Sequence, residues 1–196
     1  MPDRPDYLVS LPLPKLLHSH ETGAPLEHCI ECSRSILDSD TDYLIEKAFR
    51  SYQGFGVSDT IFEYALCMEC CNGLFSQVST ESARRLDDYF KANMNYAERM
   101  GWLREMPPDF GKWLSCCAIK GTPVTELAEY QIVAHCHGDQ LILSVFPYLI
   151  GGEAMDELCE LLSNKTIDLL DDFSGRHFAP PPEFTDTRPR RILPVL

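Results

Sequence analysis

The sequence predicts an α+β protein, in which a zinc-stabilised knuckle–hairpin–helix module is followed by a smaller module of one hairpin and helices. Three observations lead to this prediction. Two Cys-x-x-Cys pairs are separated by 34 residues. Hydrophobic and polar residues alternate in four short segments, which is typical of half-buried strands. Apolar residues recur at helical spacing after each pair of alternating segments.

The two Cys-x-x-Cys pairs, Cys29/Cys32 and Cys67/Cys70, predict a structural zinc site. Each pair places two thiolates on one tight turn, and two such turns supply the four sulfur ligands that structural zinc prefers. Four thiolates leave no position for water or substrate, so we expect the Zn²⁺ ion to stabilise the fold rather than to catalyse a reaction. Iron bound by the same four sulfurs is the alternative that the sequence leaves open.

A lead segment and a zinc-binding domain are expected in the first part of the chain. Residues 1–28 contain five prolines and no helical period, which predicts an extended lead segment. The zinc-binding domain spans residues 29–110. Inside it, residues 43–52 and 60–66 alternate and predict a β-hairpin. Lys47 is a charged residue on the apolar side of the first strand, and the pattern does not explain it.

The remainder of this domain is expected to be helical. Gly54-Phe55-Gly56 can turn the chain between the two strands. After Cys70 the apolar residues follow helical spacing, and Ser79 or Thr80 can cap a long helix that continues to about Met100. The predicted order is therefore a knuckle, a hairpin, and a second knuckle that opens a helix.

This order of elements, over about Cys29–Val78, resembles the treble-clef class of zinc finger. The resemblance implies that the first cysteine pair lies on a zinc knuckle and the second at the N-terminus of a helix. It also implies that the four paired cysteines hold one zinc ion. The gap of 34 residues between the pairs is longer than the commonest ribbon spacing, and a full hairpin accounts for it.

A smaller α+β domain is expected over residues 111–178. Residues 129–136 and 140–146 alternate around the turn His137-Gly138-Asp139, which predicts a second hairpin. Three segments are expected after this hairpin: a helix over residues 153–162, a helix from Ser163 or Asn164 to Gly175, and a Pro/Arg-rich tail over residues 179–196.

Charge and cysteine content restrict the partner and the location. The net charge is −13, and both halves of the chain are acidic. Nucleic-acid binders usually carry a basic stripe, and the compact basic group here is Arg188, Arg190 and Arg191 in the tail. We therefore expect a basic protein partner. Nine cysteines without an export signal predict the cytoplasm, and no apolar run is long enough for a membrane span.

His135 and His137 are the candidates for a second metal site. Positions two apart on a strand share a face, so two imidazoles could bind one ion, with Cys116, Cys117 or Asp139 as further ligands. The simpler interpretation is a hairpin tip with polar residues at its end. The sequence favours the simpler interpretation and leaves the metal site open as an alternative.

These observations predict a zinc-stabilised soluble binding or regulatory protein with an acidic protein-interaction surface. An inhibitor or immunity-type protein that covers a cationic surface is one version of this prediction. The chain lacks the P-loop, GxGxxG, GxSxG and HExxH motifs, so an enzyme is not favoured. Two alternatives stay open: a metal-dependent enzyme with its site at His135 and His137, and a zinc-ribbon nucleic-acid binder, which the net charge disfavours.

Overall fold

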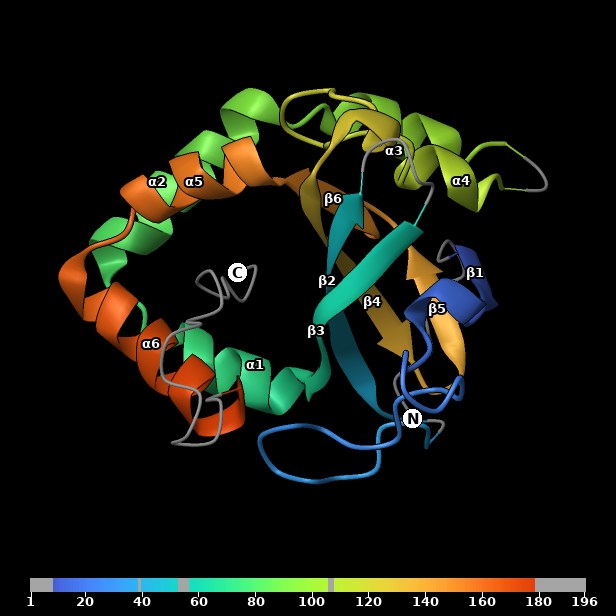
Figure 1. The fold of residues 1–196 in the computed structure, drawn as a ribbon, viewed down its shortest axis with the longest axis horizontal. Helices are drawn as coiled ribbons and strands as arrows, with labels where there is room; N and C mark the ends of the chain where they lie inside the picture. Colours follow the sequence, from blue (N-terminus) through green and yellow to red (C-terminus); the bar gives the residue numbers. More distant parts are fainter. Residues whose placement is uncertain (1–8, 39, 53–56, 106–107, 179–196) are drawn as a thin grey trace.

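The computed structural model describes residues 9–38, 40–52, 57–105 and 108–178, and an antiparallel sheet of six strands forms its centre (Figure 1). The strands lie in the order β1-β5-β4-β2-β3, and β6 pairs with the first part of β4. Their bounds are β1 Val9–Pro12, β2 Asp42–Tyr52, β3 Val57–Cys67, β4 Glu129–His137, β5 Gln140–Leu143 and β6 Tyr148–Gly151.

Both predicted hairpins are present. β2 and β3 pair from Tyr43↔Cys67 to Tyr52↔Val57, although Gly54-Phe55-Gly56 lies outside the described residues. β4 and β5 pair through Cys136↔Leu141 and His137↔Gln140. Gly138 has a φ of 54° in the tight turn between them, a left-handed conformation that glycine adopts without steric cost.

The two hairpins also pair with each other. β2 runs antiparallel to β4 over nine positions, from Asp42↔His137 to Arg50↔Glu129. One sheet therefore joins strands from both sides of residue 111, where the sequence suggests a boundary between two modules. One hydrophobic core accompanies this sheet, and it includes residues from β2, β3, β4, β5 and β6.

The N-terminal segment adds an edge strand to the sheet. β1 pairs with β5, and its last residue is Pro12, which fits an edge because proline has no backbone N–H to donate to a neighbouring strand. A short 3₁₀ helix, Lys15–Leu17, follows, and the side chain of Leu17 is fully buried. The described part of the predicted lead segment is thus packed against the sheet, while residues 1–8 lie outside the described residues.

Six α-helices and a second 3₁₀ helix, Val124–Glu126, complete the described structure. Their bounds are α1 Met68–Phe75, α2 Thr80–Asn93, α3 Tyr96–Trp102, α4 Phe110–Trp113, α5 Gly152–Glu160 and α6 Asn164–Phe178. Figure 1 shows α1, α2, α5 and α6 in an arc on one side of the sheet, with α3 and α4 near the end of the sheet where β6 lies. This combination of helices with an antiparallel sheet confirms the α+β class.

The long helix predicted from Ser79 to about Met100 is divided in two. Ser79 caps α2 as predicted, since its side chain accepts a hydrogen bond from the N–H of Ser82. The helix stops at Met94, which has extended backbone and a buried side chain. Asn95 then caps α3 by accepting from the N–H of Glu98, because a short polar side chain competes for backbone donors and favours a cap over a helix interior.

The helix predicted to end at Gly175 continues to Phe178. The ring of Phe178 lies 5.6 Å from the rings of Phe62 and Tyr64 on β3. These aromatic contacts support the last turn of α6, which a glycine alone does not terminate. The Pro/Arg-rich tail predicted for residues 179–196 lies outside the described residues.

Four hydroxyl side chains join the N-termini of α2 and α6. The oxygens of Ser79 and Ser163 are 2.8 Å apart. The N–H of Ser79 donates to the Thr166 hydroxyl over 3.1 Å, and the N–H of Ser163 donates to the Ser82 hydroxyl over 2.8 Å. Each helix therefore receives part of its cap from the other, which fixes the two helix starts against one another.

An ion pair explains Lys47, the misfit of the first hairpin. Its ammonium lies 2.8 Å from Oε2 of Glu63 on β3, and it donates over 2.5 Å to the carbonyl of His18. The Glu63 carboxylate also accepts from the Ser19 hydroxyl and the His20 N–H. The N-terminal segment is thus tied to the sheet through a nearly buried pair, in which only 5% of the Lys47 side chain is exposed.

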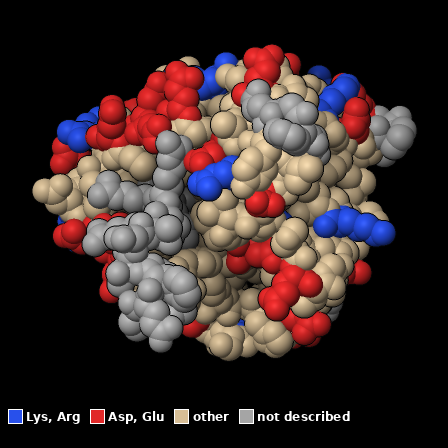
Figure 2. All heavy atoms as spheres, viewed as in Figure 1, with Lys and Arg blue, Asp and Glu red and all other residues tan. Residues whose placement is uncertain are grey.

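Acidic side chains gather on the face of the molecule drawn in Figure 2. They are most frequent over the region where Figure 1 places α2 and α5. The sequence of α5 contains four Asp or Glu residues and no Lys or Arg. Within the described residues, no helix combines the length and apolar character that crossing a membrane requires.

Candidate metal centre

The first cysteine pair lies on a tight turn that docks onto the sheet. The N–H of Cys29 donates to the carbonyl of Arg34, and the N–H of Ser33 donates to the carbonyl of Cys29. These bonds close the turn that carries Cys29 and Cys32. The N–H of Ile30 donates over 2.9 Å to the carbonyl of Ala65, so the turn is held against the last part of β3.

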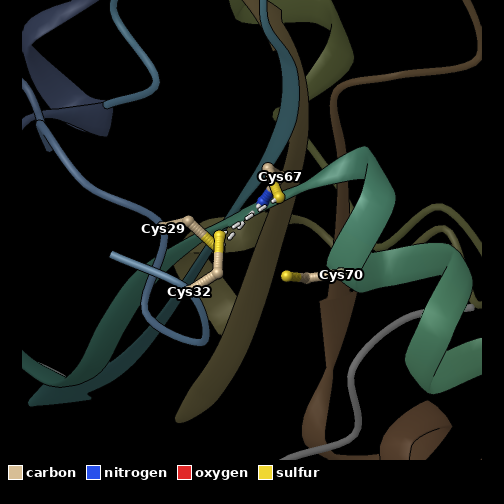
Figure 3. A group of neighbouring side chains, drawn as sticks. All are labelled: Cys29, Cys32, Cys67 and Cys70. Atoms are coloured by element: carbon tan, nitrogen blue, oxygen red, sulfur yellow. Dashed lines mark hydrogen bonds between the residues drawn. The ribbon is translucent and has the colours of Figure 1, made fainter. Parts of the chain in front are cut away.

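The second cysteine pair spans the junction of β3 and α1. Cys67 is the last residue of β3 and the residue before the first turn of α1, and Cys70 lies in that turn. The sulfurs of both pairs face one another (Figure 3). A salt bridge of 2.7 Å between Arg34 and Glu69 further links the first turn to α1.

The four sulfurs are close enough to share one metal ion. All of them lie within 4.8 Å of one another, and those of Cys32 and Cys67 are 3.8 Å apart. Tetrahedral zinc with bonds of about 2.3 Å to sulfur separates its ligands by about 3.8 Å. The cluster therefore has the ligand type, the number and nearly the spacing of a four-thiolate zinc site, and small side-chain shifts would complete it.

Burial opposes ionisation of Cys29, Cys67 and Cys70, and hydrogen bonds distinguish these three thiols. Burial raises the pKa of Cys70, and the thiols of Cys67, Cys32 and Cys29 raise it further. Burial also raises the pKa of Cys67, where hydrogen bonds from Cys70 oppose the effect and Cys29 adds to it. Burial also opposes ionisation of Cys29, but backbone N–H groups, among them that of Cys67, outweigh it and lower the pKa. A divalent cation would compensate for the mutual repulsion of four thiolates so close together.

Neighbouring candidate ligands are outside the cluster. His28 and Cys71 are adjacent to cysteines of the cluster in sequence, but neither belongs to the group at metal-binding distance. His28 takes part in a β-bridge with Ser35 that closes the first turn. Burial raises the pKa of Cys71 to about 11, in keeping with a thiol packed against the core.

Ser33 provides a test of how the first turn is held. It has a φ of 58°, a left-handed conformation that costs a non-glycine residue about 1–2 kcal/mol. Ser33→Gly removes this strain but increases the freedom of the unfolded chain, which costs about 0.5–1 kcal/mol. We expect the free energy of unfolding to rise by about 0.5–1 kcal/mol in denaturant titrations. Arg34→Gly, where φ is not positive, should lower it instead, because the unfolded chain gains freedom and the salt bridge with Glu69 is lost.

The two histidines of the second predicted metal site both contact a carboxylate of the neighbouring strand. His135 and His137 do lie on one face of β4, as predicted, and Asp42 of β2 lies between them. Its Oδ1 atom is 3.1 Å from Nε2 of His135 and 3.1 Å from Nδ1 of His137. Asp139, a suggested ligand, instead accepts a hydrogen bond from Gln140. Among the residues that the structure describes, only the four cysteines form a group with metal-ligand spacing.

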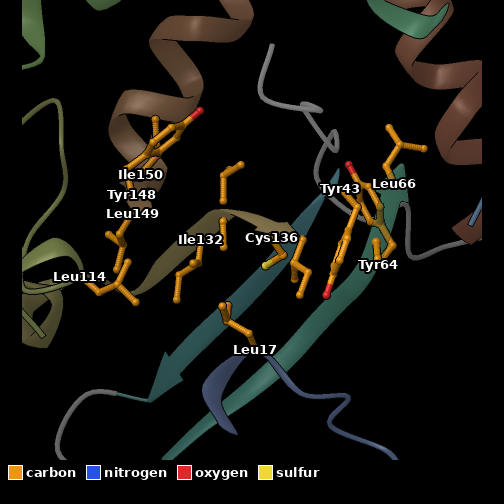
Figure 4. Close-up of a cluster of buried hydrophobic side chains, with 14 of the residues drawn as sticks. Leu17, Tyr43, Tyr64, Leu66, Leu114, Ile132, Cys136, Tyr148, Leu149 and Ile150 are labelled. Atoms are coloured by element: carbon orange, nitrogen blue, oxygen red, sulfur yellow. The ribbon is translucent and has the colours of Figure 1, made fainter. Parts of the chain in front are cut away.

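A buried carboxylate is the feature that the sequence did not indicate. Glu46 on β2 is 2% exposed, and its Oε2 atom accepts from the hydroxyl of Tyr64 over 2.5 Å and from Nε2 of Gln131 over 2.7 Å. In the alternating pattern Glu46 falls on the polar side of the strand. Helices cover that side as well, so the alternation could not show that this residue is buried. Figure 4 shows Tyr64 among the core side chains.

Comparison of the chain with protein-family models, with curated protein sequences and with solved structures finds no match. The chemistry of the site is therefore the basis for its function. That site is a four-cysteine cluster, compatible with a metal ion such as zinc, at the junction of a turn, a strand and a helix.

Proposed function

We propose that the protein is a zinc-stabilised binding or regulatory protein that contacts a basic protein partner through an acidic surface. An inhibitor or immunity-type protein that covers a cationic surface is the version that fits this charge best. The observation that carries the proposal is the closed group of four thiols, since a four-sulfur shell leaves no open position for a reacting molecule.

The position of the cysteine cluster supports a structural role for the ion. The cluster connects a turn of the N-terminal segment to β3 and α1, and Cys29 and Cys67 are buried. The order of a turn, the β2–β3 hairpin and a helix that begins at the second pair is the order of a treble-clef finger. We assign this part of the chain to that class as part of the proposal.

The acidic surface supports the choice of partner. Ion pairs with Arg84 and Lys91 offset Asp88 and Asp87 on α2. α5 has four acidic residues and none that is basic, and Lys120 pairs with two of them, Glu153 and Glu157. A surface of one sign attracts partners of the opposite sign and accelerates their association, and salt screens this attraction. The same field repels the phosphates of nucleic acids.

Titration with peptides tests the choice of partner. An oligoarginine peptide serves as the basic probe, with an oligoglutamate peptide and a short DNA duplex as matched acidic probes. We expect calorimetry to detect oligoarginine binding that weakens at least about tenfold between about 0.05 M and about 0.5 M NaCl, and no binding of either acidic probe. Oligoarginine affinity that does not change with salt, or salt-sensitive binding of the duplex, would contradict the proposal.

A further inference from the structure

A cavity of about 550 Å³ lies between the sheet and α5. Residues of β2, β3 and β4 line it on one side, and a single face of α5 lines it on the other. The helix contributes Gly152, Met155, Asp156, Cys159 and Glu160, which recur at helical spacing. The cavity is thus built from parts of the chain that are far apart in sequence.

The lining of this cavity has both carboxylates and aromatic rings. Asp156 and Glu160 are exposed and lie one helical turn apart. Glu129 on β4 also lines the cavity, but it already forms an ion pair with Arg50. Among the described residues that line it, none is Lys or Arg. The rings of Phe49 and Tyr130 stack at 5.1 Å along the sheet side. Carboxylates beside aromatic faces form the environment that a guanidinium group prefers.

Gln131 connects the cavity to a buried carboxyl group. It lines the cavity, and its side-chain amide donates to Oε2 of Glu46 over 2.7 Å. The negative charge of the cavity comes from the acidic side chains of its lining, Asp156 and Glu160 on α5 among them. These carboxylates favour a cation over a neutral group of the same size.

The last described residue of α6 lies beside the cavity. The ring of Phe178 is 5.6 Å from the ring of Phe62, and Phe62 lines the cavity. Residues 179–196 follow directly and contain Arg188, Arg190 and Arg191. The ten residues from Phe178 to Arg188 can span up to about 33 Å, so the length of the chain allows these side chains to reach the cavity.

We infer that the cavity between α5 and the sheet is a guanidinium-binding site, and that its occupant is the C-terminal segment of the same chain, through Arg188, Arg190 or Arg191. The only compact basic group of the sequence then pairs with Asp156 and Glu160. This intramolecular contact goes beyond the proposed function. The bound C-terminal segment would also compete with any basic partner for the acidic surface.

Crosslinking of the full chain tests this inference. The variant Arg188→Lys/Arg190→Lys/Arg191→Lys keeps the charge and places primary amines in the tail. A zero-length carbodiimide then joins an amine to a carboxylate only where the two are in contact, and peptide mass spectrometry locates the bond. We expect crosslinks within one chain from these lysines to Asp156 or Glu160, with a yield that falls about fivefold or more in 0.5 M NaCl.

Two additional changes serve as matched controls in the same lysine background. Asp156→Asn/Glu160→Gln should abolish the crosslinks to α5. Asp87→Asn/Asp88→Asn, on the exposed face of α2, should leave their yield unchanged. Crosslinks spread evenly over other surface carboxylates, crosslinks between two chains, or equal yields in both control variants would overturn the inference. Each of these outcomes leaves the peptide titration of the proposed function unaffected, so the two proposals can fail separately.

Discussion

Replacement of Cys67 by Ser is expected to have the largest effect on stability of any change considered. Cys67 stands where β3 joins α1, and its sulfur lies 3.8 Å from that of Cys32 in the first turn. Binding of a structural metal by these sulfurs would contribute directly to folding. We expect the free energy of unfolding to fall by at least about 3 kcal/mol in denaturant titrations, and the bound metal to be lost. Cys32→Ser should behave in the same way.

Metal analysis and chelation complete this test. The purified protein should contain one zinc ion per chain and show no visible absorption of the kind that iron–thiolate sites give. Cys116→Ser, outside the cluster, should retain the metal and change the stability by less than about 1 kcal/mol. His135→Ala/His137→Ala should also retain one ion. If the unsubstituted protein instead holds two ions and this variant loses one of them, a metal-dependent enzyme is favoured. A melting temperature of the unsubstituted protein that is insensitive to strong chelation would rule out the four-thiolate site.

The second large effect is expected at the ion pair between Lys47 and Glu63. Only 5% of the Lys47 side chain and 16% of the Glu63 side chain are exposed, so neither charge is well hydrated. Lys47→Met leaves the carboxylate with the Ser19 and His20 donors but no cation. Loss of one partner of a buried pair costs about 3–5 kcal/mol, and we expect the lower end of this range, measured by chemical denaturation.

Two variants separate the loss of this pair from other causes. Arg50→Met on the same strand breaks the pair with Glu129, in which 54% of the Arg50 side chain is exposed, and should cost less than about 1 kcal/mol. Lys47→Met/Glu63→Met removes both charges and should recover much of the stability, since an apolar pair often replaces a buried ion pair without loss. Equal effects of Lys47→Met and Arg50→Met would contradict the assignment.

The same pair predicts a dependence of stability on pH. Burial opposes ionisation of Glu63, but Lys47, Ser19 and His20 outweigh it and lower the pKa below the ordinary value of 4.5. A carboxyl group with a lowered pKa in the folded state stabilises the protein above its unfolded pKa, and this contribution is lost as the pH falls through the folded value. Lys47→Met should therefore make the loss of stability below about pH 4.5 less steep.

The sequence was sufficient to predict the elements whose signals are local. Alternation placed both hairpins, because successive side chains of a strand point to opposite faces of the sheet and this period of two is visible within a few residues. The cysteine spacing identified the four residues that meet in space. The cap at Ser79 could be predicted as well, since capping depends on residues within one turn.

Features that depend on pairing between distant segments could not be predicted from the same patterns. Nothing in the alternation of β2 indicates that its second neighbour is β4, and the four residues of β1 are too few for a periodic signal. The ends of the long helix depended on the burial of Met94, and the partners of Lys47 and of His135 come from other strands. Each of these outcomes is decided by tertiary contacts rather than by local preference.

The place of β1 at the edge of the sheet has a consequence during synthesis. Among the described strands β1 is synthesised first, yet its hydrogen bonds are with β5, at Gln140–Leu143. Until translation has passed these residues, Val9 and Leu11 have no strand to pair with. A nascent chain stalled before Gln140 therefore cannot complete the sheet, and the segment that forms β1 would be available to chaperones until β5 has emerged.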